Sequence, residues 1–215
     1  MKHPNIIKIV CHDIGRHLGC YGVKSINSNA IDTLAKNGIL FKNSFSTSPG
    51  CSPSRAAIAT GMYPHNTGVL GLAHAHFGWS LDKKINHIAK YFSKNGYTSI
   101  LFGLQHVTYH EKTLGFNKIF PERPADEVLK NITKIIDSKI FKKPFYAEVN
   151  FFEPHRPFDY GGVKPDKSKG VYIPKYIPKN IYSRREFAEM QGAIKKMDDT
   201  VFKIINLLKK KNLYE

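Results

Sequence analysis

The segment that begins at Cys51 carries the residue types and the spacing that most strongly suggest chemistry. Pro53 suits the first turn of a helix, because it lacks an amide hydrogen that would have no partner there, and Gly61 suits the end of that helix. Cys51 is therefore expected at a helix N-terminus, where backbone amides and the helix dipole favour an anion. Arg55 lies one turn further on the same face, and its planar, permanently charged guanidinium can hold an oxygen anion in fixed geometry.

Three further groups of candidate residues each follow an apolar run of strand length. They are His12 and Asp13 after residues 6–10, His106 after residues 97–102, and His155 after residues 145–151. Open α/β sheets place their ligands beyond the carboxyl ends of parallel strands. We therefore expect these side chains to share one cleft with residue 51.

The pattern along the chain predicts an α/β fold with a mostly parallel sheet flanked by helices, because strand-length apolar runs alternate with helical periods. The predicted strands are residues 6–10, 39–45, 97–102 and 145–151, and the first two are joined through a helix, which favours parallel pairing. Two helices are predicted to end at Gly38 and Gly96. A third carries the apolar stripe from Val128 to Ile136, and a long one is predicted to begin at Ser183, capped together with Glu186.

The run Cys51-Ser52-Pro53-Ser54-Arg55, followed by Thr60-Gly61, resembles the signature of the formylglycine-dependent sulfatases. The resemblance implies an alkaline-phosphatase-like fold in which Cys51 is oxidised to formylglycine and hydrated, so that one oxygen attacks sulfur. It also implies a divalent metal ion, expected to be Ca²⁺. The implied maturation partner is a formylglycine-generating enzyme or an anaerobic sulfatase-maturating enzyme.

The run Ile9-Val10-Cys11-His12-Asp13 resembles the first metal-binding element of the same family, which usually has two adjacent Asp residues. The resemblance makes Asp13 a metal ligand, together with Cys51 after its conversion. His12 stands at the first Asp position and is the third candidate ligand, although calcium prefers oxygen donors. Either the metal differs, or His12 contacts the substrate or supports a ligand, or the site is impaired.

The run Phe102-Gly103-Leu104-Gln105-His106 resembles the family's Gly-Lys-x-His element and makes His106 a catalytic candidate beside Cys51 and Arg55. Leu104 replaces the Lys of that element. The positive charge that the Lys would bring to the sulfate must then come from elsewhere, such as Arg156, Lys112 or a different loop.

The run Pro154-His155-Arg156-Pro157 resembles the family's Pro-His-x-Pro element. The resemblance makes His155 the fourth catalytic candidate, as the partner of the leaving-group oxygen. Proton transfer at that oxygen is useful because an alkoxide leaves poorly and imidazole titrates near neutral pH.

Within the family, Thr47-Ser48 and the stretch from Gly68 to Leu72 most resemble the sulfamidases, the N-sulfoglucosamine sulfohydrolases that remove N-linked sulfate from glucosamine. The implied substrate is a sulfated sugar, for example of a glycosaminoglycan. His74, His76 and Arg156 are the predicted substrate contacts, although the two histidines suit a packing role equally well.

The composition argues against several other classes of protein. The formal net charge is +16, but the 33 basic residues are mostly Lys and are spread along the chain, so a nucleic-acid partner is not expected. No apolar run approaches the roughly 20 residues of a membrane helix, so no membrane partner is expected. The segment before the first strand is too short for a signal peptide, which makes the cytoplasm the default location and leaves the periplasm or secretion open.

The 215 residues suffice for one sizeable core and are interpreted as the N-terminal part of a sulfatase catalytic domain. Complete members of the family continue to a later metal-ligand strand and a smaller C-terminal subdomain, which we expect this chain to lack. We therefore expect the chain alone to bind metal weakly and to turn over slowly or not at all. Two alternatives stay open: a phosphonate or phosphodiester hydrolase of the same superfamily, and a non-catalytic remnant that binds acidic glycans through its Lys-rich surface.

Overall fold

The computed structural model describes residues 3–74, 76, 78–142 and 144–214, and the chain divides into two compact units. The first, the sheet unit, consists of Met1–Val10, Ser44–Glu122 and Lys134–Asn150. The second, the long-helix unit, consists of Cys11–Asn43, Arg123–Thr133 and Phe151–Glu215. Each unit therefore combines segments that are far apart in the sequence.

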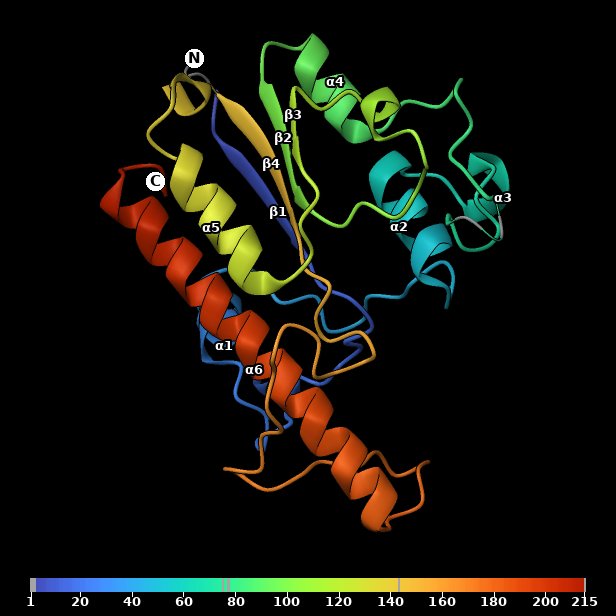
Figure 1. Cartoon of the computed structure of the whole chain (residues 1–215), viewed down its shortest axis with the longest axis vertical. Coiled ribbons are helices and arrows are strands. Elements are labelled where there is room, and N and C mark those ends of the chain that lie inside the picture. Colours follow the sequence, from blue (N-terminus) through green and yellow to red (C-terminus); the bar gives the residue numbers. More distant parts are fainter. Residues whose placement is uncertain (1–2, 75, 77, 143, 215) are drawn as a thin grey trace. The chain divides into compact units, whose positions relative to one another are not determined.

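The sheet unit is built on a parallel four-stranded sheet with the order β1-β4-β2-β3 (Figure 1). The strands are β1 (Ile6–Val10), β2 (Thr98–Gly103), β3 (Lys118–Phe120) and β4 (Phe145–Asn150). Val149 of β4 lies opposite Ile9 of β1 on one side and opposite Phe102 of β2 on the other. Every residue of β4 is buried, which suits its aromatic and β-branched content. The predicted α/β class with a parallel sheet is confirmed.

Three helices of the sheet unit connect its strands: α2 (Cys51–Thr60), α3 (Pro64–Thr67) and α4 (Ile88–Lys94). Short 3₁₀ turns, η2 (Glu111–Leu114) and η3 (Lys139–Lys142), complete the connections. α4 packs on β2 and also contacts α2. As predicted, α2 ends at Gly61, which adopts a left-handed conformation (φ 71°) and donates its N–H to the Ala57 carbonyl at 2.8 Å.

The long-helix unit contains η1 (Gly19–Tyr21), α1 (Asn29–Asn37), most of α5 (Ala125–Ile135) and the 30-residue α6 (Ile181–Lys210). α1 packs against α6, and the buried Asp198 of α6 caps the first turn of α1. Its two carboxylate oxygens accept the backbone N–H groups of Ala30 and Ile31 at 3.0 and 2.9 Å. Within the part of the chain that the structure describes, no helix is long and apolar enough to cross a membrane.

The predicted strand at residues 39–45 is wrong. These residues form neither strand nor helix, and the side chains of Ile39, Phe41 and Phe45 are 83%, 70% and 87% exposed. A strand needs a neighbouring backbone to pair with, and the described residues supply none for this segment. The apolar pattern of residues 39–45 reflects side chains that favour a strand, but it does not provide the neighbouring strand.

The predicted beginning of the long helix also needs correction. The long helix begins at Ile181 instead of Ser183, because the Asn180 side chain accepts from the Tyr182 and Ser183 amides, and the Ser183 hydroxyl in turn accepts from Asn180 N–H. Ser183 therefore has the role that the sequence assigned to Glu186.

The cap on α1 can be tested by removing the Asp198 carboxylate. In Asp198→Ala two amides at the start of α1 lose their acceptors, and we expect the free energy of unfolding to fall by about 2–3 kcal/mol. Asp199→Ala is the matched control, because its side chain is 52% exposed and pairs only at the surface with Lys195, so a change within about 0.5 kcal/mol is expected. Urea denaturation followed by circular dichroism measures both, and equal losses would contradict the cap.

Candidate active site

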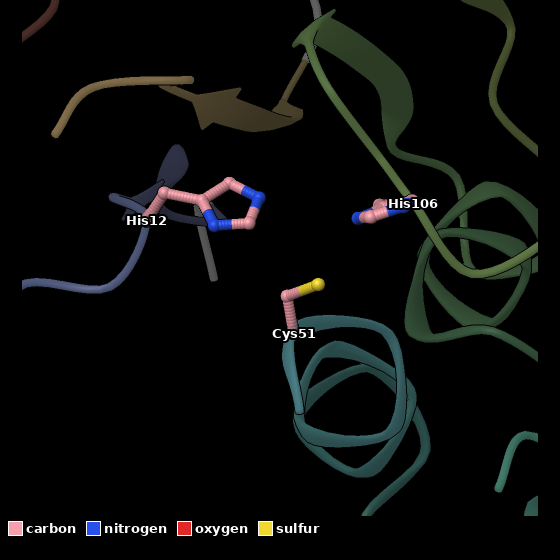
Figure 2. A group of neighbouring side chains, drawn as sticks. All are labelled: His12, Cys51 and His106. Atoms are coloured by element: carbon pink, nitrogen blue, oxygen red, sulfur yellow. The ribbon is translucent and has the colours of Figure 1, made fainter. Parts of the chain in front are cut away.

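Cys51 is the first residue of α2, as the sequence predicts, and its side chain is half-buried. Gly50 enters the helix in an extended conformation, and its carbonyl accepts the Ser54 N–H at 3.0 Å, which starts the helical hydrogen bonds. Figure 2 shows the Cys51 side chain leaving the N-terminal end of α2 on the side where His106 lies. The Cys51 Sγ and a ring nitrogen of His106 are within 4.8 Å of each other. The sequence motifs therefore bring a nucleophile candidate and an imidazole together at the positive end of a helix.

Arg55 connects α2 to the loop that carries His106. Its side chain is only 7% exposed, and Nη1 donates to the Leu104 carbonyl at 3.1 Å. Leu104 is the residue that replaces Lys in the sequence motif. The guanidinium of Arg55 thus brings a permanent positive charge to the backbone at that position.

His106 is held in a strained backbone conformation, with φ at 58°. The buried Gln105 side chain fixes this turn, because its Oε1 accepts the Val107 and Thr108 amides at 2.7 and 3.1 Å and its Nε2 donates to the Thr108 carbonyl at 2.6 Å. The ring of His74 stacks on the ring of His106, with centroids 5.8 Å apart and planes 12° from parallel. His106 is therefore presented in a fixed orientation.

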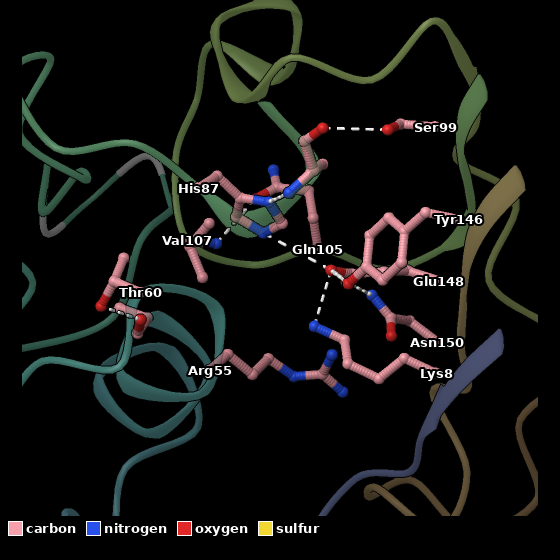
Figure 3. A network of polar contacts seen from close by, with 12 residues as sticks. Lys8, Arg55, Thr60, His87, Ser99, Gln105, Val107, Tyr146, Glu148 and Asn150 are labelled. Carbon is pink, nitrogen blue, oxygen red and sulfur yellow. Dashed lines mark hydrogen bonds and ion pairs between the residues drawn. The ribbon is translucent and has the colours of Figure 1, made fainter. Parts of the chain in front are cut away.

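A buried charge network lies beside Arg55 in the sheet unit (Figure 3). Its centre is Glu148 of β4, which is 3% exposed and pairs with the Lys8 ammonium of β1 at 2.6 Å. The Tyr146 hydroxyl donates to Glu148 at 2.5 Å, and Asn150 Nδ2 donates at 3.4 Å. Arg55, Lys8 and Glu148 line the same small cavity of about 10 Å³, on the order of the space one water molecule needs. Two cations and one carboxylate therefore share one small cavity in the sheet unit.

Burial alone would raise the pKa of Glu148, but the Lys8 ammonium lowers it below its usual range, so Glu148 is ionised at neutral pH. His87 lies 3.8 Å from Glu148, and burial lowers its pKa to about 4 against the attraction of that carboxylate. His87 is therefore neutral at pH 7, and Lys8 is the cation that keeps Glu148 charged. The same burial and the neighbouring Glu148 raise the pKa of Tyr146.

A second cluster lies in the long-helix unit, directly after β1 and β4 in the chain. His12, Asp13 and His155 each offer a ligand atom, and these atoms lie within 4.8 Å of one another. Asp13 Oδ1 is 3.1 Å from His12 Nδ1, and Asp13 Oδ2 is 3.8 Å from His155 Nε2. The His12 ring is buried and meets the His155 ring edge-on at 4.7 Å, whereas the Asp13 side chain is 51% exposed. The three residues that the sequence placed after two strands thus form one group.

Glu153 connects the backbone of this cluster to the start of α5 through two hydrogen bonds. Its carbonyl accepts the His12 N–H at 3.1 Å, and its carboxylate, 3% exposed, accepts the Ala125 N–H at the start of α5 at 2.9 Å. Burial raises the pKa of this carboxyl against the effect of that hydrogen bond. Phe152 packs against the His155 ring with centroids 4.8 Å apart. The loop after β4 is therefore tied both to the segment carrying Asp13 and to a helix end.

The donor set of this cluster fits a divalent metal ion, and its chemistry bears on which ion. Ca²⁺ takes six to eight oxygen ligands, and among these three side chains only Asp13 supplies oxygen. Imidazoles beside one carboxylate suit a softer divalent ion such as Zn²⁺ or Fe²⁺ better. Asp13 is in either case the oxygen ligand that these residues offer.

The three predicted substrate contacts lie in different surroundings. His74 stacks on His106, and His76 is exposed. Arg156 is 72% exposed and forms an ion pair with Glu186 of α6. Among the described residues, His74 therefore packs against a catalytic candidate, and Arg156 lies at the surface.

Sequence reasoning missed Lys8, His87, Glu148 and Glu153. Glu148 is a charged residue in the middle of an apolar strand, and Lys8 interrupts another in the same way. A charge within a buried strand requires a partner, so this pattern was available as a signal. The identity of the partner depends on the strand order and could not be obtained from spacing.

One protein family matches nearly the whole chain. The family model described as Sulfatase matches residues 4–215, and the chain belongs to the sulfatase family. The motif-based resemblance is thereby confirmed.

Two relatives and one solved structure illustrate this similarity. Human N-sulphoglucosamine sulphohydrolase is 26% identical over 236 residues, which cover 95% of this chain and 47% of that protein. An ulvan-active sulfatase of Formosa agariphila is 33% identical over 185 residues, which cover 83% of this chain and 35% of that protein. A solved 2-O GAG sulfatase superposes with a TM-score of 0.74 at 21% identity, covering 99% of this chain and 56% of that chain, which confirms the alkaline-phosphatase-like fold. The chain spans less than half the length of both curated relatives.

The lowered pKa of His87 predicts an acid-sensitive fold. The unfolded chain takes up a proton at this residue near pH 6.5 and the folded chain only near pH 4, so stability present above pH 6.5 is lost as the pH falls to 4. The shift corresponds to a loss of about 3 kcal/mol. His87→Asn keeps an acceptor for the Ala89 amide, which His87 now caps, but removes the titration. Urea denaturation at pH 7 and pH 4 should show the wild type losing about 3 kcal/mol more than the variant; parallel losses would refute this assignment.

Proposed function

We propose that the chain carries the nucleophile and the sulfate-binding residues of an enzyme that hydrolyses a sulfate ester or an N-sulfate group of a sugar. The supporting observation is that Cys51, within the sulfatase signature, begins α2 and lies within 4.8 Å of His106 in a chain that matches the family from residue 4 onwards. The relatives named for N-sulphoglucosamine and for ulvan support a sulfated sugar as the substrate class.

Residue 51, once oxidised to formylglycine and hydrated, would supply an oxygen nucleophile for sulfur. A formylglycine-generating enzyme or an anaerobic sulfatase-maturating enzyme is the partner that this conversion requires. The surroundings of Cys51 suit an anionic ligand, because the first-turn amides and the dipole of α2 point toward it. Arg55, which belongs to the family signature, brings a fixed positive charge to the Leu104 carbonyl.

The two histidines have separate roles in this proposal. His106, oriented by its strained turn and by the His74 ring, hydrogen-bonds the nucleophilic oxygen or a sulfate oxygen. His155 donates a proton to the leaving oxygen or nitrogen of the sugar, which would otherwise leave as a poor anion. Asp13 and His12 would hold a divalent metal ion that neutralises sulfate charge, which leaves the His155 Nε2 available for the proton transfer.

Substitution of the nucleophile and of its neighbouring cation tests the proposal. In protein that also contains the later part of the family's catalytic domain and is produced together with a formylglycine-generating enzyme, Cys51→Ala should abolish sulfate release from an aryl sulfate, and Arg55→Gln should lower kcat/KM by about 100-fold. Lys94→Gln, which removes the same charge at an exposed position at the end of α4, should leave the rate unchanged. Faster cleavage of the matching aryl phosphate, or undiminished sulfate release from Cys51→Ala, would contradict the proposal.

The identity of the metal can be tested at His12. Replacement by Asp restores the pair of carboxylates usual in the family, and we expect His12→Asp to raise the affinity for Ca²⁺ about tenfold and to lower that for Zn²⁺. His110→Asp adds the same charge at an exposed position of the sheet unit and should change neither affinity. Calorimetric titration with CaCl₂ and ZnCl₂ gives both constants. Unchanged Ca²⁺ binding in His12→Asp would show that residue 12 is not a ligand.

A further inference from the structure

A groove of about 790 Å³ lies on the long-helix unit, between the loop that follows His155 and the first turns of α6. Its lining includes Arg156, Phe158, Asp159, Arg185, Glu186 and Glu189. A second hollow, of about 370 Å³, is lined by Asp13 and His155 and shares Arg156 and Phe158 with the groove. The groove therefore continues from the metal-binding candidate cluster and is large enough for a sugar ring.

The charges along the groove differ from those of the rest of the chain. Two arginines face three carboxylates, which gives the lining a formal charge of −1, whereas the whole chain has a formal net charge of +16. A surface built to attract a polyanion would show an excess of Arg and Lys. This groove instead disfavours a further sulfate or carboxylate on the ligand.

The polar groups of the groove suit hydroxyl groups. Arg156 pairs with Glu186 and Arg185 pairs with Glu189, and the two arginines are 72% and 82% exposed. Such exposed pairs contribute little to stability, so a ligand can share their hydrogen bonds without a large loss. Guanidinium and carboxylate groups both offer paired hydrogen-bonding sites to neighbouring hydroxyls. The half-buried Phe158 supplies the apolar surface that the C–H face of a pyranose needs.

We propose that this groove binds the sugar ring next to the sulfated one, and that this ring is uncharged and rich in hydroxyl groups. The inference rests on the proposed sulfatase function and narrows its substrate to an oligosaccharide. The sulfated ring is followed by a neutral hexose in such a substrate, and not by a uronate or a second sulfated ring.

Three probes test the inference in the unreactive Cys51→Ala protein by calorimetry: N-sulfoglucosamine, the same ring linked to glucose, and the same ring linked to glucuronate. The glucose-linked probe is expected to bind about tenfold more tightly than the single ring and about fivefold more tightly than the glucuronate-linked probe. Equal binding of the single ring and the glucose-linked probe, or a preference for glucuronate, would overturn it.

Substitutions in the groove provide the second readout. Glu186→Gln combined with Glu189→Gln changes the formal charge of the lining from −1 to +1, and should reverse the preference in favour of the glucuronate-linked probe. Phe158→Ala should remove most of the gain from the second ring. Glu127→Gln, an exposed carboxylate on α5 that pairs with Lys130, is the matched control and should change no affinity. An unaltered preference in the double variant would also overturn the inference.

The proposed function is tested separately, in protein that retains Cys51 and in which this residue has been oxidised to formylglycine. Failure to release sulfate from an aryl sulfate, in protein that also contains the later metal-ligand strand and C-terminal subdomain of complete family members, would reject the proposed function and the inference with it. Sulfate release together with equal affinities for all three probes would reject only the groove.

Discussion

The parallel arrangement of β1, β4 and β2 is the constraint on which the candidate chemistry depends. Because all three strands run in the same direction, their carboxyl ends lie at the same edge of the sheet. The chain places His12 and Asp13 directly after β1, His106 after β2, and His155 after β4. The positions of the candidate catalytic and metal-binding residues along the chain therefore follow from the strand direction and from four short motifs.

Buried charged side chains link neighbouring strands and connect the loops that carry candidate residues to helices. Lys8 and Glu148 link the neighbouring strands β1 and β4 inside the sheet unit, and removal of one member of such a pair leaves an uncompensated buried charge. Arg55 lines the same cavity and reaches across to the loop of His106. Glu153 has a comparable role in the long-helix unit, where it connects the His12 backbone to the start of α5. The catalytic candidates are thus supported by polar contacts that sequence motifs do not include.

Much of the fold could be predicted from the sequence, because long periodic segments and glycine ends are local signals. β1, β2, β4 and the helix that starts at Cys51 follow such signals closely. Residues 39–45 were predicted wrongly, since pairing depends on a partner strand and not on side-chain pattern. β3 has only three residues and gave no detectable pattern. The cap at Asn180 was missed because Ser183 and Glu186 form an equally suitable pair in sequence.

The candidate site could be predicted as a set of residues but not as an arrangement. Motifs located Cys51, Asp13, His106 and His155, whereas the stacking of His74, the Glu148 network and the groove beside Arg156 depend on contacts between distant segments. The central claim is that converted residue 51 is the nucleophile for sulfate release. The most direct test measures sulfate release from protein samples in which mass spectrometry shows graded formylglycine content at residue 51. In protein that also contains the later part of the family's catalytic domain, the account predicts a rate proportional to that content and zero without it; a rate independent of conversion, or none at full conversion, would contradict it.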